Sequence, residues 1–266
     1  MRARGAAVLA VITSLAVLAD LLYPGDPLDM VAEPLIWPGT DARFWLGTDS
    51  LGRSVAACLV HGARISLIVG VLATALSLSI GIVVGAVSGY LGGLVDQLLM
   101  RVLEVVQVIP AFLFVLTLVA VDQARPLTIA GGIGVVAWPV VARLVRGQFI
   151  ALRGTELVLA ARSQGFSPLT IMTKEILPNA IAPVLVTAPV LVANAILMES
   201  ALSFLGVSGP NSVSWGTMIS EGRDVIQSAW YLTALPGGLI AVTVVAFNLV
   251  GDALNDALNP RARGYT

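Results

Sequence analysis

The sequence has little charge and few of the side chains that form disulfides or metal sites. Charged residues make up 12% of the 266 positions and hydrophobic residues 57%, whereas soluble domains have roughly 25% charged residues. One cysteine and one histidine exclude a disulfide framework and a zinc site built from the usual ligands. A formal net charge of −1 gives no basic surface for nucleic acid. The composition therefore predicts an all-α protein that crosses a membrane several times.

Lysine is also nearly absent, which excludes one way of binding ATP. A phosphate-binding P-loop needs glycines followed by a lysine and then Ser or Thr, but the sole lysine, Lys174, is followed by Glu175. His61 lies beside a predicted membrane entry, so we expect an interfacial residue rather than a catalytic base. No nucleophile and base pair is visible. We therefore expect a chain that is not an enzyme and that binds no cofactor or metal itself.

Long apolar runs dominate the sequence instead. A helix needs about 20 mostly apolar residues to cross about 30 Å of hydrocarbon. The first run could also be a secretory signal, but no clear cleavage site follows it, which favours an uncleaved anchor. Counting the runs against bilayer thickness predicts six transmembrane helices, at Ala6 to Leu22, Ile65 to Ser88, Val105 to Val121, Leu127 to Ala142, Ala180 to Met198 and Ala229 to Gly251.

The distribution of arginine and lysine predicts the orientation of these helices. With the amino terminus in the cytoplasm, ten basic residues fall on the inner side and five on the outer side, which obeys the positive-inside rule and places both termini in the cytoplasm. The predicted division is a first helix with an outer proline-rich strap (1–62), a transmembrane core with an inner loop at 150–178 (63–252), and a cytoplasmic tail (253–266).

Two outer segments are expected to be irregular. The strap contains four prolines, and each proline fixes its own φ and biases the preceding residue toward extended conformations. The strap's roughly 40 residues are too few for an independent core. The stretch from Ser203 to Ser220 is rich in Gly, Ser and Pro, which favours a partly buried outer loop over a seventh helix.

The second predicted span carries Gly81, Gly85 and Gly89 on one helical face. Small residues at this spacing let helix backbones approach closely within lipid. Ordinary helix packing is the favoured interpretation, and a moving surface during transport is the alternative.

The fifth predicted span contains prolines and ends at a carboxylate. Internal prolines free backbone carbonyls, which are tolerated in a membrane only where protein or water satisfies them. This helix is therefore expected to line an interior, and ionisable groups at membrane depth suggest functional sites. For Glu199, which lies near the predicted outer interface, a structural carboxylate whose hydrogen bonds are satisfied within the protein is an equal alternative. The residues assigned to a translocation path or gate are Pro183, Pro189, Asn194, Met198 and Glu199.

The inner loop between the fourth and fifth spans predicts two helices separated by a break. Thr155 can cap a short helix that starts at Glu156, an acid at the positive end of the dipole. Gly165 supplies a left-handed stop. Ser167 and Pro168 then read as a cap and first position of a second helix, which we expect to run to a boundary at Pro178.

The first of these helices has a surface suited to a cytoplasmic partner. Leu157, Ala160, Ala161 and Gly165 combine one apolar side chain with small ones, so a groove of another protein could approach closely. We predict that this helix is the docking element of the chain.

At these residues the chain resembles a known family. The pattern ELVLAARSQG (156–165) followed by ILPN (176–179) resembles the Glu-Ala-Ala loop of membrane subunits of bacterial ABC importers, whose short helix docks into the ATP-hydrolysing subunits. Ala160, Ala161, Gly165, Leu177 and Pro178 match positions of that motif. Leu159 stands where the motif's glutamate is expected, which puts one polar contact with the ATPase in doubt.

Other stretches narrow the resemblance to the C-type permeases of the peptide and nickel importer group. They occur in the expected order and cover nearly the whole chain. Phe44, Ser54, Ala57 and Cys58 depart from the group's outer signature. The matching stretches are LGTDSLGRS (46–54), HGARISL (61–67), GYLGGLVDQLLMR (89–101), LSFLGVSGPNSVSWG (202–216) and FNLVGDALNDALNPR (247–261).

The resemblance implies a type I ABC importer permease in the cytoplasmic membrane of a bacterium. It implies a second, homologous permease as partner, ATPase subunits that bind ATP and Mg²⁺, and an external substrate-binding protein that delivers dipeptides or short peptides, with lipid surrounding the spans. Nickel complexes or another small cargo remain alternatives. A self-contained channel or ion-coupled carrier is the alternative of another class, but it would be expected to place charges at mid-membrane, and the span centres are almost bare.

Overall fold

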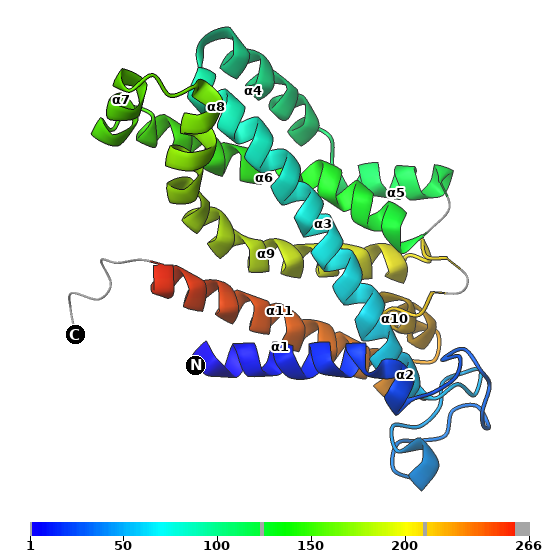
Figure 1. Ribbon diagram of the computed structural model, residues 1–266. Helices are drawn as coiled ribbons and strands as arrows, with labels where there is room; N and C mark the ends of the chain where they lie inside the picture. The colour runs from blue at the N-terminus through cyan, green and yellow to red at the C-terminus, as the bar shows by residue number, and fades with distance from the viewer. Residues whose placement is uncertain (1, 123–124, 210–211, 259–266) are drawn as a thin grey trace.

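The computed structural model describes residues 2–122, 125–209 and 212–258. Within these ranges the regular secondary structure is helical, apart from two isolated β-bridges in and next to the strap. Four helices are long and apolar enough to cross a membrane. They are α3 (Val55–Leu91), α6 (Pro126–Leu152), the continuous helix Pro168–Phe204, and α11 (Tyr231–Leu258). Figure 1 shows α3 crossing the others obliquely.

The first predicted span is shorter than the sequence suggested. Helix α1 (Arg2–Val17) has 16 residues and is therefore only about 24 Å long. A break at Leu18 separates it from α2 (Ala19–Leu22). Helix α1 packs against α11 and α3.

The third predicted span is not one continuous helix. Helix α4 (Gly93–Val108) and helix α5 (Ala111–Val121) pass together as one possible span but are bent by 78°. The break lies at Ile109, which is extended (φ −73°, ψ 123°) and precedes Pro110. A residue before proline is disfavoured in helical conformation, so the chain leaves the helix there. The described residues thus contain four helices long and apolar enough to cross a membrane, or five candidates if the bent pair counts as one, with α1 as a shorter apolar helix.

The fourth predicted span extends ten residues beyond its predicted end. Helix α6 runs through Arg143 and Arg146 because both guanidinium groups have partners on α4. Arg143 donates a hydrogen bond to Gln107, and Arg146 pairs with Asp96. Both arginines, which lie beyond the predicted end of the span at Ala142, thus contact a second helix.

The predicted boundary at Pro178 is wrong. Helix α8 (Pro168–Thr170) continues through a π-helical turn, η2 (Ile171–Ile176), into α9 (Leu177–Phe204). Pro178 therefore lies inside a continuous helix, directly after the π-helical turn, where its missing N–H removes one hydrogen bond of the helix. Pro183 and Pro189 lie inside the same helix.

The three glycines of α3 face α6. A Cβ added at Gly81 would lie 2.5 Å from Cβ of Val141, and one at Gly85 would lie 2.5 Å from the carbonyl oxygen of Ala142. A Cβ at Gly89 would lie 2.6 Å from Cβ of Phe149. Only glycine permits this approach, because real Cβ atoms do not come so near to other atoms.

The proline-rich strap is largely irregular, as predicted, and it packs on the helices. Its one helical turn is η1 (Ala42–Phe44). The buried Tyr231 of α11 brings its hydroxyl within 3.0 Å of the Ile36 carbonyl and 2.8 Å of the Thr48 carbonyl. The strap is thereby joined to the last helix of the chain.

The predicted outer loop is wrong in part, because it contains the start of α10 (Trp215–Arg223). A capping box between Ser214 and Thr217 starts this helix, in agreement with the rule that reciprocal caps satisfy the first amide groups. Trp215 is fully buried and donates from Nε1 to the carbonyl of Leu59 on α3. A helix of nine residues gives a weak signal in a stretch rich in Gly and Ser.

The strap and the inner loop lie at opposite ends of the described chain. Figure 1 shows the start of α1, the end of α11 and helix α7 (Glu156–Ser163) on one side, and the strap, α2 and α10 on the other. The predicted boundary at 62/63 falls inside α3 and the one at 252/253 inside α11. Of the predicted tail, residues 259–266 lie outside the described residues.

Candidate functional site

Helix α7 begins where the sequence predicts, but Thr155 does not cap it. Thr155 has extended backbone angles and its side chain accepts no capping bond. Its Oγ1 instead donates to the carbonyl of Leu152, 2.8 Å away, so it stabilises the end of α6. Glu156 remains in the first turn of α7, as the dipole argument requires.

The carboxyl end of α7 is closed by the predicted glycine. Gly165 has φ of +81°, and its N–H donates to the carbonyl of Arg162 at 3.0 Å, while Phe166 N–H donates to that of Ala161 at 3.1 Å. This pair of bonds is a Schellman motif. The following helix begins with Ser167, whose Oγ accepts from Thr170 N–H, as predicted.

The two faces of α7 differ in exposure. Val158 and Ala161 are buried in an apolar cluster of this chain that includes Ile171 and Ile176. Leu157 and Leu159 are 53% and 51% exposed. Glu156, Ala160, Gly165 and Pro178 are also exposed, and Leu177 is half-buried. Ala161 therefore anchors α7 within its own chain, whereas Leu157, Leu159 and Ala160 are open to a partner.

Arginine side chains connect the helices at the end of the molecule that carries α7. Arg162 of α7 lies over the ring of Tyr90 on α3, 5.5 Å from its centroid. Arg153 donates to the carbonyl of Gly89 at 3.1 Å. Arg146 makes a bidentate pair with Asp96, at 2.6 and 2.7 Å. These contacts join α7 to α3, the end of α6 to α3, and α6 to α4.

These contacts between helices were not predicted from the sequence. Asp96 stands in the GYLGGLVDQLLMR stretch that supports the family resemblance, so its partner could have been sought among the arginines of α6. Tyr90 belongs to the same stretch, but nothing in the sequence pairs it with Arg162.

The predicted path residues do not share one surface. Glu199 is buried and accepts hydrogen bonds from Ser203 of its own helix and Ser66 of α3, at 2.7 and 3.2 Å. Met198 packs in a cluster with α5 and α6, and Pro189 faces Gly251 of α11. Asn194 is exposed and Pro183 half-buried. Glu199 matches the alternative of a satisfied structural carboxylate, and assignment of the others to a path stays a prediction.

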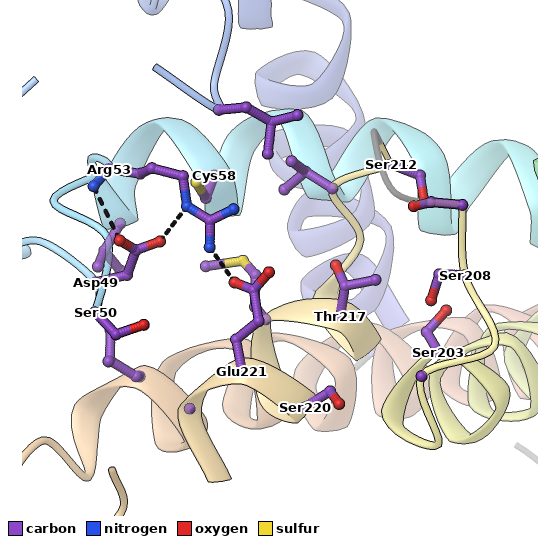
Figure 2. A pocket seen from close by; sticks show the side chains of 18 residues that line it. Asp49, Ser50, Arg53, Cys58, Ser203, Ser208, Ser212, Thr217, Ser220 and Glu221 are labelled. Carbon is purple, nitrogen blue, oxygen red and sulfur yellow. Dashed lines mark hydrogen bonds and ion pairs between the residues drawn. The ribbon is translucent and has the colours of Figure 1, made fainter. Parts of the chain in front are cut away.

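A second polar site lies at the opposite end, between the strap and α10. Arg53 is buried and bonds Asp49 at 2.5 Å through Nε, while its terminal nitrogen pairs with Glu221 of α10. Figure 2 shows this guanidinium between the two carboxylates. Burial acts to lower the pKa of Arg53, but Asp49 and Glu221 outweigh it and hold that pKa above its ordinary value. The strap and α10 are thus joined by an ionic contact.

A pocket of about 220 Å³ opens beside this ion pair. Besides the charged groups, hydroxyls line it from α9, α10 and the loop between them, namely Ser203, Ser208, Ser212, Thr217 and Ser220. The Oγ of Ser208 is buried and has no hydrogen-bond partner among the described residues. The pocket can therefore hold water or another polar group.

The family can be decided by comparison with known proteins. Residues 81–264 match the family described as binding-protein-dependent transport system inner membrane component. The chain belongs to this family. As an inner membrane component it is a multi-pass membrane protein and one part of a transport system with further subunits.

Two relatives are similar to this chain over most of its length. It is 35% identical to the di/tripeptide transport system permease protein DppC of Pseudomonas aeruginosa, over 93% of this chain and 84% of that one. It is 43% identical to the oligopeptide transport system permease protein OppC of Escherichia coli K12, over 85% and 75%.

A solved structure supports the fold. The MetNI methionine ABC transporter, in an inward-facing conformation, matches with a TM-score of 0.62 at 18% identity, over 76% of this chain and 96% of that chain. The fold is that of an ABC importer permease, as the sequence resemblance implied.

Proposed function

We propose that this chain is a permease subunit of an ATP-driven importer that carries dipeptides or short peptides across the cytoplasmic membrane of a bacterium. The relatives named for dipeptide and oligopeptide transport support peptides as cargo. Nickel complexes or another small cargo form the second candidate, which the resemblance of the outer signature keeps open. A self-contained carrier is disfavoured because the helix centres offer no paired charges for ion coupling.

The observation that carries the proposal is the two-faced structure of α7. Its inner face is fixed in the chain by Val158 and Ala161, and its outer face presents Leu157, Leu159 and Ala160. A short helix held this way can transmit force from a partner without changing its own shape. We propose that ATPase subunits, which bind ATP and Mg²⁺, grip this face from the cytoplasm.

Transport then follows from two discrete arrangements. ATP binding draws the ATPases together and moves α7, and the charged contacts of Asp96 and Arg162 pass that movement to α3, α4 and α6. Together with a homologous second permease, the chain would alternate between inward and outward openings. An external binding protein would deliver the peptide to the end that carries the strap, and both termini would lie in the cytoplasm.

Cross-linking tests the docking of α7. A cysteine at Ala160, reacted with a short bifunctional reagent in the purified complex, should cross-link to an ATPase subunit. A cysteine at Thr40 of the strap, which is exposed at the opposite end, should not. The native Cys58 is buried and gives little background. If Thr40→Cys cross-links and Ala160→Cys does not, the proposed docking face is wrong.

Uptake tests the cargo. Proteoliposomes with both permeases, ATPases and the binding protein should accumulate labelled dipeptide when ATP is supplied. Ala160→Arg should abolish accumulation while the protein still inserts and assembles. Accumulation of a nickel complex without peptide uptake would favour the second candidate. Uptake by the isolated chain without ATPases would favour a self-contained carrier.

A further inference from the structure

A groove between α1 and α3 is not used by the proposed transport mechanism. It has a volume of about 500 Å³ and is lined by residues of both helices, including Ala16, Leu67, Ile68 and Val71. Nearly all of its surface is apolar. Along α3 it extends from Arg64 to Leu72, about 12 Å at the rise of an α-helix. Within a membrane span, an open apolar groove of this shape faces hydrocarbon chains rather than water.

Two charged side chains, Arg64 and Asp20, form the mouth at one end of the groove. Arg64 pairs with Asp20 of α2 at 2.9 Å and also donates to the carbonyls of Ala16 and Val17. These carbonyls belong to the last turn of α1, which leaves them without helical partners. Arg64 therefore caps α1 and fixes the mouth. His61 also faces Asp20, with Nδ1 3.9 Å from its carboxylate.

The two charges of the mouth remain accessible. The Asp20 side chain is 72% exposed and that of Arg64 34%. They lie at the end of the molecule that carries the strap, where α2 meets α3 (Figure 1). A guanidinium and a carboxylate above an apolar groove match a head group with one phosphate and one ammonium, above an acyl chain.

We propose that this groove binds one zwitterionic phospholipid with a primary ammonium head group. The acyl chain lies along Leu67, Ile68 and Val71, the phosphate faces Arg64, and the ammonium donates to Asp20. A purely anionic head group would place its charge beside the Asp20 carboxylate, and a trimethylated ammonium has no N–H to donate. The lipid would hold α1 and α2 against α3.

Lipid retention tests this site. The complete transporter complex is exchanged into equal amounts of dioleoyl phosphatidylethanolamine, phosphatidylcholine and phosphatidylglycerol, and lipids retained after gel filtration are counted by native mass spectrometry. Phosphatidylethanolamine should be enriched about two- to fivefold over each other lipid, which is the discrimination an exposed ion pair supplies. Equal retention of the three lipids, or none because another subunit covers the groove, would overturn the proposal.

Two variants and one control separate head group from chain. Asp20→Asn should bring the ratio of phosphatidylethanolamine to phosphatidylcholine close to one. Val71→Trp fills the groove from α3 without touching the ion pair, so it should reduce retention of all three lipids. Asp41→Asn breaks a similar exposed pair with Arg43, which borders a pocket lined mostly by strap residues rather than the groove between α1 and α3, and it should change nothing. Unchanged retention in Val71→Trp would refute the site even if Asp20→Asn misfolds.

Discussion

Replacement of Gly165 by valine should uncouple ATP hydrolysis from uptake without hindering membrane insertion. Gly165 has φ of +81°, and a Cβ there would meet no atom within 4 Å. Any penalty therefore comes from the backbone alone. A left-handed conformation costs an L-residue roughly 1–2 kcal/mol, and a β-branched residue is especially unfavourable there. A free-energy cost of this size lowers the ratio of native to non-native conformations at the end of α7 by about 5- to 30-fold.

The loop itself provides matched controls. Gly154→Val lies in the same loop, also meets no atom within 4 Å and has no positive φ, so it should keep wild-type coupling. Gly165→Asn should recover most of the coupling, because Asn tolerates the left-handed region. The assay measures ATP hydrolysis and dipeptide uptake in the same proteoliposomes. If Gly165→Val couples normally, or if Gly154→Val fails as severely, the argument that the Schellman motif sets the shape of α7 is refuted.

Three further changes test packing away from α7. Gly85→Val should destabilise the chain by about 1–3 kcal/mol through overpacking against α6, seen as a lower melting temperature of the purified complex, and Gly131→Val, which meets no atom within 4 Å, should not. Arg53→Ala leaves buried Asp49 without its partner and should cost about 3 kcal/mol, whereas the exposed Arg43→Ala should leave the melting temperature unchanged. Trp215→Phe replaces the fully buried indole with a smaller phenyl ring and removes its hydrogen bond to the Leu59 carbonyl, so the lost bond should cost about 1 kcal/mol and the cavity should add to that cost. An unchanged melting temperature in Gly85→Val, Arg53→Ala or Trp215→Phe would contradict the contact concerned.

The sequence predicted the features that depend on local chemistry. The fold class, the irregular strap, the left-handed turn at Gly165 and the cap at Ser167 follow from composition, proline and side-chain hydrogen bonding, and all are present. The four-residue spacing of the glycines on α3 predicted that another helix packs closely there. The structure shows that this helix is α6, which the spacing alone could not tell.

The differences between the predictions and the structure have separate causes. The fourth span was predicted to stop before Arg143, and the contact of Arg143 with Gln107 of α4, 36 residues away, could not be read from the local sequence. The proline after Ile109 is a local signal for the break there, but the count of apolar residues was run across it and predicted one span. Ala161 was assigned to a partner because the pattern of small residues does not tell which face of an eight-residue helix points inward.

The π-helical turn of η2 has a consequence for the direction of α7. Such a turn contains one residue more than an α-helical turn, and one residue corresponds to a rotation of about 100° around the helix axis. Deletion of one residue from Ile171–Ile176 would restore regular winding and swing α8, together with the preceding segment, by about that angle. The length of this single turn therefore sets the direction in which Leu157 and Ala160 point relative to the helices that cross the membrane.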